Sequence, residues 1–264
     1  MSDARLSGGP SLLPREHGAY AQLAFPLVTA LALGDPGSAP ILLTIAIAAT
    51  FLAHEPVMVL SGGRGGRAKR ESGDRARRRV ALLLAVALIA GVAGLWLAPS
   101  TARTSALVPF ALGGLLVPLA ISRREKTLIG ELLVSVALSS TMIPVGLAGG
   151  AGPRATFVAF VVWAVVFALG TVTVRAIIAR AKKGAQRRTA HLAPLLSAVA
   201  IAAAAVLAWQ TELPARAAVA VVPTALVALV FGALGVHPRN LRRMGWSLVA
   251  SNIFVLAALL IGLG

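Results

Sequence analysis

The sequence contains no cysteine and is poor in charged side chains. The absence of cysteine excludes both disulfides and thiolate chemistry. Charged residues make up 13% of the 264 residues and hydrophobic residues 58%, whereas a soluble domain carries about 25% charged residues. So few polar groups could not cover the surface of a soluble fold. The composition therefore indicates a membrane protein.

Acidic residues are scarcer still, with nine Asp and Glu against 25 Lys and Arg. The three aspartates, at positions 3, 35 and 74, lie outside the apolar segments, and none pairs with another acid at helical spacing. A Mg²⁺ ion bound through diphosphate usually needs protein carboxylates, and a Ser-His-Asp triad needs an Asp near a His. Neither site is expected, and the prediction for metal ligands is none.

Apolar segments of about the length that crosses a bilayer recur along the whole chain, separated by loops rich in glycine, proline or charge. The predicted spans are 17–33, 39–60, 80–98, 105–121, 128–148, 155–178, 191–209, 215–236 and 244–263. Residues 1–14 are polar, carry no signal-peptide pattern and are expected to form a flexible cytoplasmic tail. The sequence predicts an all-α, polytopic membrane helix bundle that forms one integral membrane domain over residues 1–264.

The distribution of positive charge predicts how the bundle is oriented. With the N-terminus inside, 22 of the 25 Lys and Arg fall in cytoplasmic segments, and only Arg103, Arg154 and Arg216 fall outside. Such a bias follows the positive-inside rule, and it explains the net charge of +16 without a nucleic-acid partner. We therefore expect a multi-pass protein of the cell's inner (cytoplasmic) membrane, with nine spans, a cytoplasmic N-terminus and an external C-terminus.

Ionisable residues at membrane depth are costly, so each is a candidate functional residue. Glu16 and His17 open the first span, and His54 and Glu55 lie near the inner end of the second. Because these spans run antiparallel, the four side chains could form one cluster near the cytoplasmic face. If the protein is an enzyme, they are the catalytic candidates, with Glu16, Glu55 or His54 as the general base. The alternative to a functional role is that these four side chains extend to the membrane interface or pair with one another.

A basic loop predicted over residues 61–79 carries eight Lys and Arg and includes the sequence GGRGGR at 62–67. Glycine lets the backbone approach a ligand closely, and the guanidinium group of arginine can bind phosphate through two parallel hydrogen bonds. Arg64 and Arg67, flanked by glycine, are therefore predicted to bind an anionic ligand. Contact of the loop with anionic lipid headgroups is the alternative.

A second basic segment, SRREKT at 122–127, joins the fourth and fifth spans through a short turn. It holds Arg123, Arg124 and Lys126 near the helix ends, and Arg175 is expected on the same side of the membrane. Glu131 lies about one turn into the fifth span. We include these residues in the predicted binding site, because basic segments gathered on one face favour an anionic ligand, and a diphosphate fits best by charge.

Several stretches resemble the YwiC-like family of bacterial membrane proteins. They are PREHGAYAQLAFPL at 14–27, FLAHEP at 51–56 and GGRGGR at 62–67, and HPRNLRRMGW at 237–246 is similar to the last loop of that family. The resemblance implies membership of a membrane-protein family and no particular activity.

The layout of the chain also resembles that of the UbiA superfamily of intramembrane prenyltransferases. SRREKTLIGELLVSVALSSTMIPVGL at 122–147 and FVVWAVVFALGTVTVRAIIARAKKG at 160–184 look like its fifth and sixth helices. This resemblance implies a nine-helix fold, a membrane-open cavity, a long apolar ligand and Mg²⁺ as a cofactor. However, the two Asp-rich motifs that hold Mg²⁺ are replaced by HEPVMVLSGGRGGR at 54–67 and RAIIARAKKGAQRR at 175–188.

The sequence thus favours a protein of the lipid bilayer that binds an isoprenoid or lipid with an anionic head in a cytoplasm-facing cavity. If the protein is an enzyme, we expect a divergent prenyltransferase. A transporter or lipid-handling protein without covalent chemistry is one alternative, since the prolines within the spans fit either class. A haem- or quinone-associated protein using His17 and His54 is another.

Overall fold

The computed structural model describes residues 12–14, 17–121, 126–181, 187–209, 217, 219–234 and 240–264, and these residues contain α-helices and no β-strand. The prediction of an all-α fold is confirmed in this part of the chain. The chain divides into two compact units, one of residues 1–17 and 38–98 and the other of residues 18–37 and 99–264. We describe each unit by itself, and the single integral domain stays a prediction.

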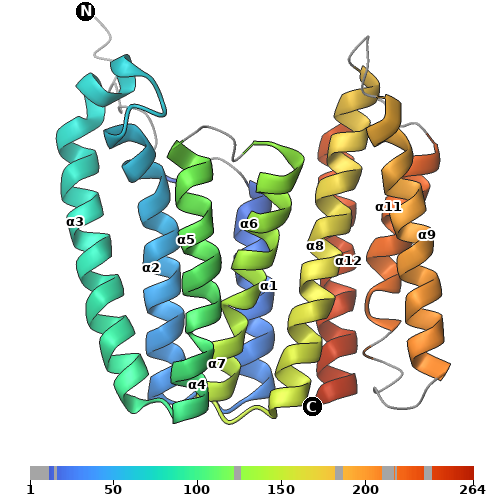
Figure 1. Cartoon of the computed structure of the whole chain (residues 1–264), viewed down its shortest axis with the longest axis horizontal. Helices are drawn as coiled ribbons and strands as arrows, with labels where there is room; N and C mark the ends of the chain where they lie inside the picture. The colour runs from blue at the N-terminus through green and yellow to red at the C-terminus, as the bar shows by residue number, and fades with distance from the viewer. Residues whose placement is uncertain are drawn as a thin grey trace, which may run out of the picture. The chain divides into compact units, whose positions relative to one another are not determined.

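The first unit is built on two antiparallel helices, α2 (Ser38–Leu60) and α3 (Gly66–Leu97), which lie side by side (Figure 1). Small residues line the contact between them. A Cβ atom added at Gly94 would lie 3.0 Å from the Leu43 side chain and backbone nitrogen. The two helices approach this closely because Gly94 has no side chain.

Helix α3 begins earlier than the sequence predicted. The segment at 61–79 was expected to be a loop, yet it is helical from Gly66 onward, and the helix continues without a break to Leu97. The physical reason is local. Ala, Arg, Lys and Glu are strong helix formers, and Arg67 pairs with Glu71 one turn away at 2.7 Å. The sequence interpretation used these basic residues to predict the side of the membrane. It overlooked that the same residues favour a helix.

The second unit is assembled around α8. Its helices are α1 (His17–Leu33), α4 (Ser100–Ser105), α5 (Leu107–Ile121), α6 (Leu128–Ser140), α7 (Met142–Ala148), α8 (Pro153–Ala181), α9 (Arg187–Trp209), α11 (Val222–Ala233) and α12 (Leu241–Leu263). Helix α8 contacts α6, α7, α9, α11 and α12. Its fully buried Trp163 donates its indole N–H to Thr29 of α1 at 2.9 Å and stacks on Phe25 and Phe167.

Among the residues that the structure describes, six helical segments are long and apolar enough to cross a membrane. They are 38–60, 66–97, 100–119, 128–148, 153–180 and 241–263, and shorter apolar helices occupy 18–33, 193–206 and 222–233. The chain is therefore a multi-pass α-helical membrane protein. The predicted span at 105–121 agrees with α5, which the short helix α4 precedes, and the predicted span at 128–148 is divided at Thr141. The total of nine crossings, the orientation of the termini and the UbiA-like layout stay predictions.

We expect Gly94→Val to destabilise the pairing of α2 with α3. The added methyl groups would enter space that Leu43 occupies, and overpacking of this kind costs about 1–3 kcal/mol. Thermal unfolding followed by circular dichroism in detergent should show a lower Tm. Gly73→Val is the matched control, since it lies on the same helix with nothing within 4 Å of its added Cβ. Equal losses of Tm in the two variants would contradict the packing account.

Candidate functional site

A buried carboxylate–guanidinium pair lies where α2 turns into α3. Arg64 Nε donates to Glu55 Oε1 at 2.8 Å, and Arg64 Nη2 donates to Glu55 Oε2 at 2.5 Å. The Glu55 side chain is 1% exposed and that of Arg64 is 21% exposed. Two parallel hydrogen bonds between charged groups fix the guanidinium in both position and orientation.

The turn between the helices allows this pair to form. After α2 ends at Leu60, Gly62 and Gly65 adopt left-handed conformations with φ of 80° and 93°, which side chains with a Cβ rarely accept. Added Cβ atoms at these two positions would meet nothing within 4 Å. The chain can therefore reverse in a few residues, which brings Arg64 over Glu55. The backbone is open at Gly62 and Gly65, whereas a Cβ atom added at Gly63 would lie 2.6 Å from the Met58 side chain.

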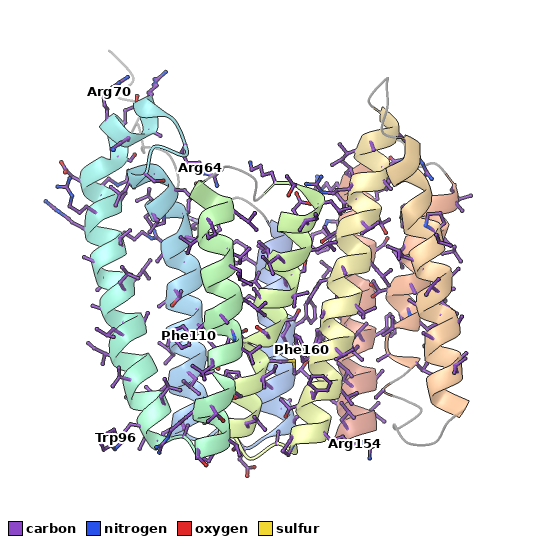
Figure 2. The ribbon with its side chains drawn as sticks, viewed as in Figure 1. Arg64, Arg70, Trp96, Phe110, Arg154 and Phe160 are labelled. Atoms are coloured by element: carbon purple, nitrogen blue, oxygen red, sulfur yellow. The ribbon has the colours of Figure 1, made fainter. Side chains whose placement is uncertain are left out.

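The turn also leads directly into the N-terminus of α3. Its N-cap residue is Gly65, and no side chain caps the first N–H groups of the helix. Those groups and the helix dipole create a positive potential at this end. Arg67, Lys69 and Arg70 in the first turns are exposed and add to it. Figure 2 shows Arg64 and Arg70 at this end of the first unit.

The sequence placed further residues in this site. His54 precedes Glu55 but is exposed, and the Arg67 side chain is 86% exposed and pairs with Glu71. Glu16 lies outside the described residues, and the side chain of His17, which begins α1, is also outside them. The structure thus brings Glu55 and Arg64 together, and the four-residue cluster of Glu16, His17, His54 and Glu55 stays a prediction.

The second unit contains a comparable pair. Arg175 Nε on α8 donates to Glu131 Oε2 on α6 at 2.5 Å, and Arg175 Nη2 donates to the carbonyl of Lys126. Thr127 caps α6 by accepting from Gly130 N–H at 3.2 Å. The Lys126 side chain is exposed. The Arg175 guanidinium therefore lies beside the Glu131 carboxylate and the Lys126 carbonyl, and a role of these residues in ligand binding stays a prediction.

Arg123 and Arg124 lie outside the described residues, so their place in a basic turn stays a prediction.

Sequence reasoning missed a chain of uncharged polar groups beside Glu131. Ser135 of α6 accepts from Gln22 of α1 at 3.1 Å, lies 3.4 Å from the hydroxyl of Thr171 on α8, and donates to the Glu131 carbonyl at 3.0 Å. A scan for uncharged polar residues inside the predicted spans would have found these three side chains, because such residues commonly join helices within membranes.

The described residues do not fit the Mg²⁺ site that the UbiA resemblance implied. Within them, no three His, Asp or Glu side chains gather where they could hold a metal ion. The described carboxylates in or near the two basic segments are those of Glu55, Glu71, Asp74 and Glu131, and each pairs with an arginine.

The long apolar helices and the charged pairs at helix ends define the class of this protein as a polytopic α-helical membrane protein. A family model described as YwiC-like protein matches residues 13–147, about half of the chain. The chain belongs to the YwiC-like family, and the matched residues include the whole of α2, the glycine turn and α3. Neither the curated proteins nor the solved structures that were compared gave a match.

We expect Arg64→Met to lower the free energy of unfolding by about 3–5 kcal/mol, because it removes the guanidinium that pairs with the buried Glu55 carboxylate. The double variant Glu55→Leu/Arg64→Met should recover most of this loss, because it removes both charges. Chemical unfolding in detergent measures each value. Arg67→Met, which breaks the exposed pair with Glu71, is the control and should change little. If the double variant were as unstable as Arg64→Met, the claim that Arg64 acts by neutralising the charge of Glu55 would be wrong.

Proposed function

We propose that this YwiC-like protein binds an isoprenoid or lipid with an anionic, diphosphate-like head, and that the head is bound at the glycine turn. The observation that carries the proposal is Arg64, which Glu55 holds by two hydrogen bonds within a turn whose backbone is open at Gly62 and Gly65. A guanidinium fixed in this way matches a phosphate group in geometry as well as in charge.

The surroundings of Arg64 supply further attraction for an anion. The uncapped N-terminus of α3 points backbone N–H groups toward the same turn, and helix N-termini are common phosphate sites. Arg67, Lys69 and Arg70 are exposed in the first turns. These cations would neutralise the diphosphate in place of a metal ion, as cation clamps do in phosphoryl-transfer sites.

The apolar part of the ligand would lie in the bilayer beside the long helices, so the ligand is amphipathic. The bias of positive charge toward one side predicts that the turn faces the cytoplasm and that the membrane is the inner (cytoplasmic) one. The proposal is limited to binding. Transfer of the prenyl group to an acceptor would be a further reaction, and the proposal does not require it.

Farnesyl diphosphate is a suitable probe for binding to the purified full-length protein by isothermal titration calorimetry. We expect binding to persist in EDTA, because the clamp consists of protein cations. Arg64→Met should weaken binding at least tenfold, which corresponds to about 1.4 kcal/mol. Since that variant also loses stability, Arg67→Gln/Arg70→Gln provides a second test at exposed positions, and we expect severalfold weaker binding with unchanged folding.

Arg103→Gln is the control, since Arg103 is an exposed arginine on α4 in the other unit. Binding that disappears on chelation would overturn the metal-free clamp. Binding unaffected by either set of variants at the turn would overturn its location.

A further inference from the structure

A second basic feature of the first unit lies further along α3. A hollow there is lined by residues from α3 and from the segment that precedes α1, namely Leu12, Arg75, Arg78, Arg79, Leu82 and Leu83. Relative to Arg75, the other four α3 residues lie three, four, seven and eight positions further along, so the five share one face of the helix. On this face of α3, the three arginines are followed by two leucines toward the C-terminal end of the helix.

The wall opposite this face is fixed by packing. Leu12 is buried at 5% exposure and packs with Val59 of α2 and Ala76 of α3, which is fully buried. The segment that contains Leu12 is therefore packed beside the three arginines of α3. The site is a groove between two parts of the chain rather than a bare helix surface.

The arginines of the groove have no carboxylate of their own in the part of the chain that the structure describes. The neighbouring Asp74 pairs with Arg77, which is not part of the lining. Arg75 and Arg78 are exposed, and Arg79 is half-buried. Three like charges within two helical turns repel one another, and an external anion would relieve that repulsion.

The position of the groove along α3 matches the boundary of a bilayer. Arg79 and Trp96 are 17 residues apart, or about 25 Å at 1.5 Å per residue, close to the thickness of a hydrocarbon core of about 30 Å. Trp96 is 80% exposed, and tryptophan prefers the membrane interface. In Figure 2, Trp96 lies at the end of α3 opposite to Arg70. With Trp96 at one interface of a bilayer, this length of helix would put the guanidinium groups near the lipid phosphates of the other interface and Leu82 at the start of the acyl region.

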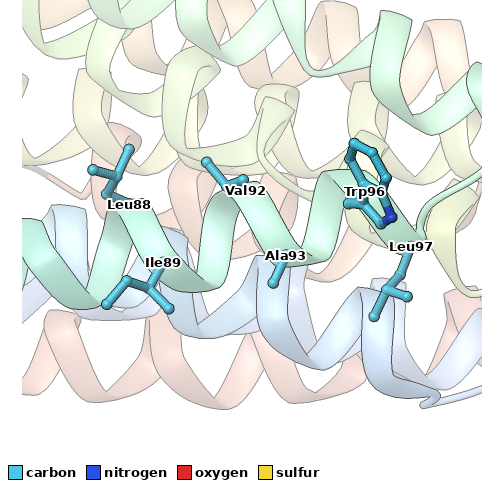
Figure 3. A pocket seen from close by; sticks show the side chains of 6 residues that line it. All are labelled: Leu88, Ile89, Val92, Ala93, Trp96 and Leu97. Atoms are coloured by element: carbon cyan, nitrogen blue, oxygen red, sulfur yellow. The ribbon is translucent and has the colours of Figure 1, made fainter.

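The same helix face continues as an apolar surface toward Trp96. Leu82, Val86, Ile89, Ala93 and Trp96 follow one another at alternating spacings of three and four, and each of the larger side chains among them is exposed. Near its end a shallow apolar hollow forms around the small Ala93 (Figure 3), with Leu88, Val92 and Trp96 along one edge and Ile89 and Leu97 along the other. A hydrocarbon chain fits this surface along its length.

We infer that the groove of Leu12, Arg75, Arg78, Arg79, Leu82 and Leu83 is a binding site for an anionic phospholipid of the surrounding bilayer. The phosphate of the lipid pairs with the three arginines, and an acyl chain lies along Leu82 and the apolar face beyond it. This site is separate from the glycine turn, and the inference does not rest on the proposed function.

Native mass spectrometry of the full-length protein, released from detergent containing equal amounts of phosphatidylglycerol and phosphatidylcholine, tests this site. The wild-type protein should retain phosphatidylglycerol preferentially. Arg75→Gln/Arg78→Gln/Arg79→Gln should reduce retained phosphatidylglycerol at least fivefold. Arg154→Gln/Arg242→Gln/Arg243→Gln removes the same charge from exposed positions of the second unit, and it should retain phosphatidylglycerol within twofold of the wild type.

Two further arms identify the source of the anion and the part played by the leucines. Inorganic phosphate at millimolar concentration should not displace the lipid, whereas displacement would show a free-phosphate site and overturn the inference. Leu82→Ala/Leu83→Ala keeps the arginines and should still lower retention severalfold. Equal losses in the two arginine triples, or a loss in neither, would also overturn the inference. Farnesyl diphosphate binding should be unchanged in the groove triple, which separates failure of this site from failure of the site at the turn.

Discussion

The structure of the first unit depends on compensating one buried charge. The Glu55 carboxylate lies within α2 at 1% exposure, where an uncompensated charge would be severely destabilising. Arg64 compensates it only because the chain reverses within a few residues, and that reversal requires the left-handed conformations of Gly62 and Gly65. The turn then determines where α3 begins. It thereby sets the face on which each basic residue of that helix lies.

The second unit pairs Glu131 with Arg175, whose side chains are 39% and 27% exposed, and it joins its helices through uncharged polar groups. Trp163 donates to Thr29 between α8 and α1, and the hydroxyls of Thr224 and Ser251 meet at 3.0 Å between α11 and α12. Polar groups away from water are costly unless they are bonded. Such bonds help to determine which helices are neighbours, because apolar surfaces in a bilayer discriminate weakly between partners.

The sequence was a good guide to the helices and a poorer guide to the site. Helices such as α1 and α2 were predicted to within a residue or so, because long apolar runs bounded by glycine and charge leave few alternatives. The helical start of α3 was missed, since charge was taken to indicate a loop. Glu55, Glu131 and Arg175 were candidates because ionisable groups at membrane depth are costly, and Arg64 was a candidate because glycines flank it. Their pairing could not be predicted, because it depends on turn geometry at Gly65 and on the helix contacts of α6 with α8.

The central claim is that the guanidinium of Arg64, held by Glu55, contacts the anionic head of the ligand. Solid-state NMR can measure the dipolar coupling between ³¹P in bound farnesyl diphosphate and ¹⁵N in the arginine side chains of the protein in lipid bilayers. The account predicts a coupling to the Arg64 guanidinium that persists in EDTA. Bound ligand whose phosphorus shows no coupling to Arg64, with coupling only to other arginines, would contradict it.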